Sequence, residues 1–197
     1  GMWNTSFLVR SHGLSLQHAG LLVGVICGIS AGIGGLLSGW LSDRLCRRHP
    51  HWQISIPVLG HLAALAALTP YLLWSDALLV RLGDVPVPTA MLWAALYSFF
   101  AVWWIAPSYN LVTQLVPANR RGTAMALQTI VSTLLGVGIG PLITGLFSDM
   151  LLPLFGQESL RYALMLVSLP VIGAVLLLVR TAHHASRTAY RHAATVS

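Results

Sequence analysis

Charged residues are scarce in this chain of 197 residues. Only 8% of the residues are charged, whereas a soluble domain contains about 25%, and 56% of the residues are hydrophobic. Lysine is absent, so that all eleven strongly basic residues are arginine, as in proteins from GC-rich bacterial genomes. Only five residues are acidic. This composition excludes a soluble globular domain and predicts an integral membrane protein.

Residues that form crosslinks or bind metals are also few. The two cysteines, Cys27 and Cys46, are separated by nineteen positions, which is about 28 Å along one helix and excludes a disulfide between them. The sequence contains no HExxH motif and no phosphate-binding loop. Three histidines near the end of the chain fit no metal-binding spacing: His183, His184 and His192. We therefore expect neither a metal site nor a cofactor.

Charge-free stretches divide the chain into membrane spans. Crossing the hydrocarbon core takes roughly 17 to 25 helical residues, and five stretches are long enough: Gly20 to Leu41, Ile54 to Trp74, Val87 to Asn110, Gly122 to Ser148, and Tyr162 to Val179. The apolar segment Gly1 to Val9 is too short to span and lacks the charged start and cleavage site of a signal peptide. It is predicted to be the end of a severed helix.

The predicted fold class is therefore all-α, a polytopic transmembrane helical bundle with five full spans and a truncated first helix. This domain is expected to occupy residues 1–182, and residues 183–197 are expected to form a disordered cytoplasmic tail.

The distribution of arginine predicts the orientation. Eight of the eleven arginines fall in alternate connectors and in the tail: Arg44, Arg47, Arg48, Arg120, Arg121, Arg180, Arg187 and Arg191. The positive-inside rule places that side, and with it the carboxy terminus, in the cytoplasm, and we expect a bacterial inner membrane. Because the arginines are scattered over short connectors, their expected partners are anionic lipid headgroups and not nucleic acid.

The segment Gly39 to Arg48, GWLSDRLCRR, carries the most specific motif. An acid such as Asp43 at a helix carboxy terminus opposes the helix dipole at a cost of about 0.3 to 1 kcal/mol, which predicts a specific partner. The segment resembles the loop signature of the major facilitator superfamily, G-x-L-[AS]-D-R-x-G-R-R. The matching residues are Gly39, Leu41, Ser42, Asp43, Arg44, Arg47 and Arg48, and Cys46 stands where the signature has glycine. The resemblance implies a gating loop that latches to a neighbouring helix end; the alternative is an ordinary basic loop.

Two further segments resemble the second half of such a carrier. Residues 121–127 (RGTAMAL) and 136–149 (GVGIGPLITGLFSD) are similar to its eleventh helix, especially in Spinster-like members. The opening residues resemble the outer end of a seventh helix through Trp3, Phe7, Arg10, His12, Gly13 and Ser15. The spans would then be helices eight to twelve, and the missing amino-terminal half would be a partner.

The resemblance implies a fragment of a secondary active transporter that moves a small organic or amphipathic solute by alternating access. The alternative is a truncated or accessory membrane protein without transport activity of its own.

Glycine and proline mark predicted contacts between helices. Gly20, Gly24, Gly28 and Gly32 recur every four residues and leave one helix face nearly bare, and small residues allow membrane helices to approach closely. Proline within a helix lacks a hydrogen-bond donor and bends the helix. The predicted packing or bending residues are Gly28, Gly32, Gly136, Gly140 and Pro141, with static packing as the alternative to a role in motion.

The third span is the predicted lining of a substrate cavity, since the corresponding helix lines the cavity in carriers that the chain resembles. Tyr97, Phe100 and Trp104 share one face by helical spacing. The candidate lining residues are Tyr97, Trp104, Asn110 and Gln128. Aromatic residues that face lipid are the alternative for Tyr97 and Trp104, and a hydrogen bond between helices is the alternative for Asn110 and Gln128.

His61 lies within a span, where it is a candidate proton relay.

An enzymatic function has little support. Residues 28–32 spell G-x-S-x-G, but this motif needs a strand-to-helix turn and here it lies inside a predicted helix. A serine hydrolase pair of Ser30 and His61 is the sharper variant, and no third catalytic group accompanies it. We therefore predict no catalytic residue.

Overall fold

The computed structural model describes residues 3–73, 78–82 and 85–195. Four helical ranges in it are long and apolar enough to cross a membrane: Leu16–Cys46, Trp52–Leu73, Ala90–Leu115 and Ala118–Arg180. The last range has 63 residues and turns back on itself at the short helix η4 (Gly156–Glu158). The sequence predicted five spans because it counted the two arms of this range separately. The number of five remains a prediction.

The first long helix is assembled from three pieces that follow a short amino-terminal helix. The pieces are α2 (Leu16–Leu22), the π-helical segment η1 (Val23–Cys27) and α3 (Gly28–Cys46), and the preceding helix is α1 (Trp3–His12). Gly13 makes the turn between α1 and α2 with a φ of 63°, which favours glycine. The Ser15 side chain then accepts a hydrogen bond from the backbone N–H of His18 at 3.2 Å and caps α2.

A β-hairpin interrupts the otherwise helical fold. After α4 (Trp52–Leu73), strand β1 (Leu78–Leu82) pairs antiparallel with β2 (Val85–Pro88). This hairpin was not predicted from the sequence, and the predicted helical bundle agrees with the four long apolar helical ranges. The residues Gly83 and Asp84 between two apolar runs rich in valine and leucine are typical of a hairpin. The predicted end of the second span, Trp74, lies outside the described residues.

The third predicted span is broken in the middle. Helix α5 (Ala90–Ala101) and helix α6 (Ile105–Leu115) are separated by three turn residues. Pro107 explains the break, because it has no N–H to donate to the carbonyl of Trp103 four residues earlier. The predicted one-face alignment of Tyr97 and Trp104 is therefore interrupted.

The carboxy-terminal part is a long helical hairpin. Its elements are η2 (Ala118–Arg120), α7 (Arg121–Thr133), the π-helical segment η3 (Leu134–Ile139), α8 (Gly140–Phe155), η4 and α9 (Ser159–Thr195). Pro141 lies two residues after the end of η3, a π-helical segment with a wider turn than an α-helix, and the bend predicted at Pro141 remains a prediction. Helix α9 continues to Thr195. The disordered tail expected from residue 183 and the domain division at residue 182 both remain predictions.

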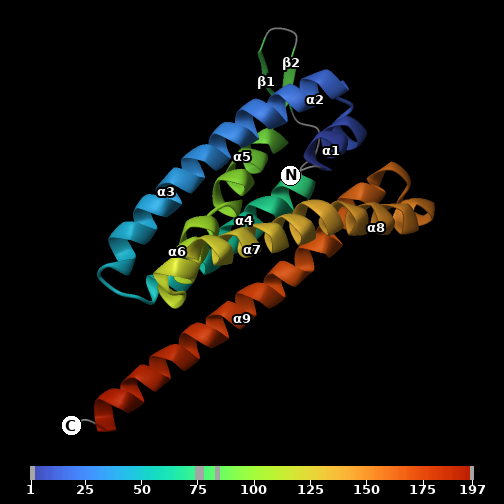
Figure 1. The fold of residues 1–197 in the computed structure, drawn as a ribbon. Coiled ribbons are helices and arrows are strands. Elements are labelled where there is room, and N and C mark those ends of the chain that lie inside the picture. Colours follow the sequence, from blue (N-terminus) through green and yellow to red (C-terminus); the bar gives the residue numbers. More distant parts are fainter. Residues whose placement is uncertain (1–2, 74–77, 83–84, 196–197) are drawn as a thin grey trace.

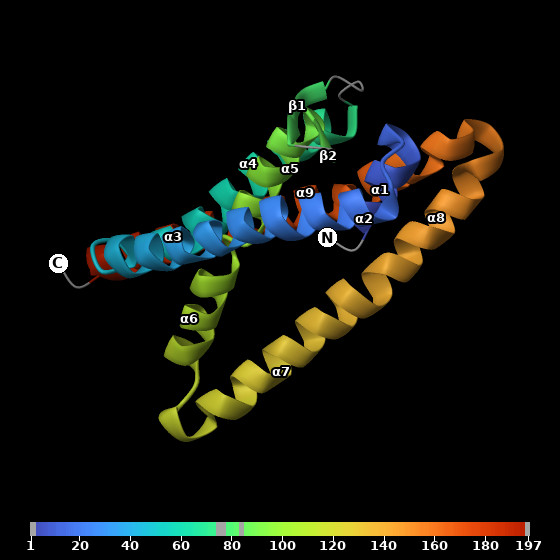
Figure 2. The same ribbon diagram turned by 90° about the horizontal axis from the view of Figure 1, so that it is seen from above.

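The helices pack into a group around α4. Helices α5 and α9 lie against α4, and α3 lies against α5 (Figure 1). The arm formed by α7, η3 and α8 runs diagonally away from α3 (Figure 2); its main contacts are with α6 at one end and with α9 at the other. The turns after α3 and α6 lie at the same end of the molecule (Figure 1), as the predicted topology requires.

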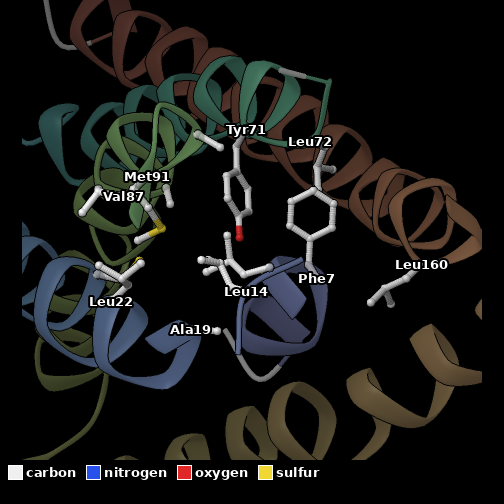
Figure 3. Close-up of a cluster of buried hydrophobic side chains, with 13 residues drawn as sticks. Phe7, Leu14, Ala19, Leu22, Tyr71, Leu72, Val87, Met91 and Leu160 are labelled. Atoms are coloured by element: carbon white, nitrogen blue, oxygen red, sulfur yellow. The ribbon is translucent and has the colours of Figure 1, made fainter. Parts of the chain in front are cut away.

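A hydrophobic cluster joins α1 to the other helices at the opposite end. Phe7, Tyr71 and Leu160 belong to this cluster and are at most 1% exposed (Figure 3). The rings of Phe7 and Tyr71 meet edge to face with their centroids 5.1 Å apart, a favourable aromatic geometry. The cluster thereby anchors α1, which has only ten residues, to α4 and α9.

Candidate functional site

The predicted gating loop lies at the end of α3. Asp43 and Arg44 are exposed there, and the Arg44 guanidinium lies 5.3 Å from the ring centroid of Trp40. Among the residues that the structure describes, Asp43 forms no ion pair. Arg47 and Arg48 are exposed in the turn that follows. The motif therefore presents its charges outward, and the partner predicted for Asp43 remains a prediction.

Cys46 fits the position at which the family signature has glycine. Helix α3 continues through Cys46, and Arg47 has a φ of −65°, a value that any L-residue adopts. The Cys46 sulfur also lies 3.8 Å from the Ser42 hydroxyl. A glycine is not needed for this turn, which resolves the departure from the signature.

The glycine face of α2 and α3 points away from the rest of the described chain. A Cβ atom at Gly20, Gly24, Gly28 or Gly32 would have nothing within 4 Å, and the same holds for Gly136. The buried face of α3 instead follows Gly34, Ser38 and Ser42. Two residues correspond to 200° around a helix, so Gly34 faces almost opposite to Gly32. Among the described residues nothing packs against Gly28 or Gly32, and their role in packing or motion remains a prediction.

Close approach occurs at two glycines that the spacing did not single out. A Cβ at Gly34 would collide with the carbonyl oxygen of Phe99, and a Cβ at Gly60 would lie 2.5 Å from the Cβ of Trp103. These contacts hold α3 against α5, and α4 against the end of α5 and the break that follows it. Gly39 makes only an ordinary contact, because its Cβ would lie 3.9 Å from that of Ala106.

A cavity of about 470 Å³ lies among five parts of the chain. Its walls come from α1, α4, α5, the η3–α8 junction and α9. The predicted site residues that line it are Tyr97, Gly136, Gly140 and Pro141. His61 lines it as well. Sequence reasoning missed two aromatic residues in the wall, Trp3 and Tyr71. No local pattern marks them, because the cavity forms only when distant helices meet.

His61 faces this cavity in a defined tautomer. Its Nδ1 atom lies 2.7 Å from the carbonyl oxygen of Pro57. Because a carbonyl only accepts, Nδ1 carries the hydrogen, and Nε2 of the neutral ring is an acceptor.

The other three predicted lining residues lie outside the cavity wall. Trp104 lies in the break of the third span and is half-buried. Asn110 accepts a hydrogen bond from Gln114 at 3.2 Å within α6, and Gln128 donates one from α7 to the Ser108 hydroxyl at 3.0 Å. The bond of Gln128 is the helix-to-helix contact given above as the alternative, and its role in substrate binding remains a prediction.

Comparison with known proteins agrees with this architecture. The model of the Major Facilitator Superfamily matches residues 1–195. The chain belongs to the major facilitator superfamily. This membership points to a transporter and not to an enzyme, and it agrees with Ser30 lying inside α3 and not at a strand-to-helix turn.

A curated member of the superfamily gives a more specific comparison. The chain is 29% identical over 175 residues to a protein of Mycolicibacterium smegmatis named "MFS-type efflux pump". The matched region covers 88% of this chain and 38% of that relative. The chain thus spans well under half the length of the curated superfamily member that it matches.

Proposed function

We propose that this chain is the carboxy-terminal part of a secondary active transporter that moves a small organic or amphipathic solute by alternating access. The match to the superfamily over residues 1–195 carries the proposal. The cavity of about 470 Å³ inside an apolar helical group supports it, because pockets for small molecules usually enclose about 300 to 1,000 Å³. The likeness to an efflux pump favours export.

In this proposal, the five spans are helices eight to twelve of a Spinster-like carrier, and an amino-terminal half completes the transport path. The eight-arginine side faces the cytoplasm of a bacterial inner membrane, together with the carboxy terminus. Asp43 and its arginines form a latch with that other half in one of the two states. The outward position of these charges on α3 supports the latch.

Two irregular points supply the bending that alternating access needs. The break between α5 and α6 lies at residues 102–104, and the π-helical segment η3 precedes Pro141. Hinges of transporters absorb backbone rotation at a few such residues. The cavity is bordered by Ala101 just before the first point and by Gly136 and Pro141 at the second, so that bending there changes its shape.

Transport is tested in inverted membrane vesicles that contain the product of the whole coding sequence. Respiratory energisation should drive accumulation of a fluorescent amphipathic dye above the level of vesicles without the protein. Vesicles that contain only residues 1–197 should show no accumulation. Equal accumulation by the two preparations would contradict the need for a second half, and dye at background in both would overturn the transporter proposal.

The DNA upstream of Gly1 separates this proposal from the accessory-protein alternative. The carrier proposal expects about six further spans and a second copy of the loop signature, as in the family that the chain belongs to. A stop codon followed at once by a start codon at Met2 would favour the accessory protein.

A further inference from the structure

We propose that the β-hairpin of β1 and β2 is a membrane-contact site, and that its partner is the phospholipid headgroup region at that end of the bundle. The hairpin connects two apolar helices, α4, which ends at Leu73, and α5, which begins at Ala90. It lies at the end of the molecule opposite the turn that follows α3 (Figure 1). This contact requires only that α4 and α5 span the membrane, so it is independent of the proposed transport.

The two strands of the hairpin differ in burial. Val87 of β2 is 4% exposed and belongs to the hydrophobic cluster, so β2 attaches the hairpin to the helices. In β1, Leu78 is 52% exposed, and Leu79 and Val80 are each 45% exposed. The described part of the chain therefore leaves three consecutive apolar side chains of β1 uncovered.

The directions of these side chains favour lipid over a protein that docks on one face. Val80 pairs with Val87 and therefore lies on the same face of the hairpin as that buried residue. Leu78 pairs with Pro88, the next residue of β2, and lies on the opposite face. Both Leu78 and Val80 are about half exposed. A protein docked on one face would leave the other face in water, whereas lipid surrounds both.

The apolar surface of β1 has exposed apolar neighbours in the adjoining helices. Leu73, the last residue of α4, is 55% exposed, and Leu92, near the start of α5, is 54% exposed. Leu73 and Leu92 belong to helical ranges that are long and apolar enough to cross a membrane, where exposed leucines meet lipid. Leu78 follows Leu73 by five positions, a distance of at most about 18 Å. This short connection keeps β1 within reach of the same lipid layer.

Backbone groups and charge place the hairpin among the headgroups and not in the hydrocarbon core. A two-stranded sheet has unpaired backbone groups along its outer edges, which the hydrocarbon core does not accept. Pro86 and Pro88 have no N–H group, which removes two donors that would otherwise need partners and lowers the cost of leaving bulk water. Arg81 is exposed in β1, and a guanidinium binds a phosphate through two parallel hydrogen bonds. The headgroup region satisfies the backbone, the arginine and the leucines together.

The accessibility of a nitroxide label measures the depth of the hairpin. Leu78→Cys, Leu79→Cys and Val80→Cys are made one at a time in the product of the whole coding sequence, from which all other cysteines have been removed. Each protein is spin-labelled in vesicles of phosphatidylethanolamine and phosphatidylglycerol. Oxygen concentrates in lipid, whereas a neutral nickel chelate stays in water. The ratio of oxygen to nickel collisions should lie between those of a lipid labelled in its headgroup and a lipid labelled at the middle of its acyl chain.

His49→Cys is the matched control, because His49 is exposed in the connector between α3 and α4, at the opposite end of the molecule. Its label should collide with nickel more often than the labels on the hairpin. Hairpin labels that collide with nickel as often as the control label would place the hairpin in water and overturn the contact. Hairpin labels shielded from both oxygen and nickel would show that protein covers the hairpin and would overturn lipid as the partner.

Charge substitutions test the side chains that hold the hairpin at the interface. Leu79→Asp should shift the collision ratio of a label at position 78 toward that of the control label, because a carboxylate favours water. Arg81→Glu, which repels phosphate, should cause a shift in the same direction, whereas Arg81→Lys keeps the charge and should keep the parental ratio. Unchanged ratios in both Leu79→Asp and Arg81→Glu would overturn the contact. Because the labels report depth and not transport, failure of the dye assay overturns the proposed function and leaves this contact standing.

Discussion

The hydroxyl of Ser38 donates a hydrogen bond to the carbonyl oxygen of Trp103 at 2.9 Å. Ser38 is fully buried in the middle of α3, and Trp103 lies at the break of the third span. The carbonyl needs an outside donor, because the residue four positions later is Pro107, which has no N–H. One helix thus supplies the hydrogen bond that a proline removes from another.

Replacing Ser38 with alanine should destabilise the protein. The change leaves the Trp103 carbonyl buried without a donor, at a cost of about 1 to 3 kcal/mol in the free energy of unfolding. Thermal unfolding in detergent measures the effect. Ser55→Ala is the matched control, because Ser55 bonds only to His51 in its own turn, at 3.1 Å, and should cost much less. Equal stability of S38A and the parent would show that the contact contributes nothing.

Two adjacent glycines of α3 should respond oppositely to alanine. Gly34→Ala places a Cβ against the Phe99 backbone, which cannot move aside as a flexible side chain would, and overpacking of this kind costs about 1 to 3 kcal/mol. Gly35→Ala meets open space and should be neutral or slightly stabilising, because alanine favours the helix. The yield of folded protein and its melting temperature distinguish the two variants. A stable G34A protein would contradict the close approach of α3 and α5.

The bond between Gln128 and Ser108 should couple α6 to α7. A double-mutant cycle with Gln128→Leu and Ser108→Ala is expected to give a coupling energy of about 0.6 kcal/mol, and at most about 1.7, as for other hydrogen bonds between membrane helices. Thermal unfolding of the four proteins gives this energy. If Q128L instead abolishes dye transport without a change in stability, Gln128 acts in substrate binding, as the sequence first suggested.

Neutralising Asp43 tests the latch. Asp43→Asn keeps the size of the side chain and removes its charge, so the state held by the latch should lose about 1.5 to 3 kcal/mol, a shift of tenfold or more between inward and outward populations. Distance measurements between spin labels on the two halves of the whole carrier report these populations. The control is Asp149→Asn, because Asp149 lies in α8 near the turn at η4. This change should leave the two populations unchanged. Unchanged populations in D43N would disprove the latch.

Leucine on the exposed glycine face should separate folding from transport. Gly28→Leu and Gly32→Leu meet no described atom within 4 Å of the new Cβ, so this part of the protein should fold as before. If another half packs on that face, dye transport by the whole carrier should fall to background. Transport at the parental rate with either variant would contradict a close contact there.

Hydropathy predicted the apolar helices well, whereas the irregular points within them were missed. The second predicted span ends one residue beyond α4, which runs from Trp52 to Leu73. The break before Pro107 was not predicted, because the candidate lining residues were placed on an uninterrupted helix. The hairpin of β1 and β2 was not predicted either, since hydropathy marks the spans and not the structure of the connectors between them.

Contacts between helices were harder to predict than the helices themselves. Gly32 and Gly34 have the same side chain and lie two residues apart, yet only Gly34 touches a neighbour. Nothing local distinguishes them, because the covered face depends on where α5 lies. The wall of the cavity was even harder to predict from the sequence. Trp3 and Tyr71 come from helices that are far apart in the sequence, and only Tyr97 among the four predicted lining residues reaches the wall.

The arm of α7, η3 and α8 has a consequence for biosynthesis. Because this arm contacts the described helices mainly at its two ends, it can leave the insertion machinery and enter lipid before its neighbours are docked. Small side chains and exposed leucines along it then stay accessible until assembly is complete. A chain in which this arm stays uncovered would display it to membrane proteases, so that cellular turnover becomes a measure of correct assembly.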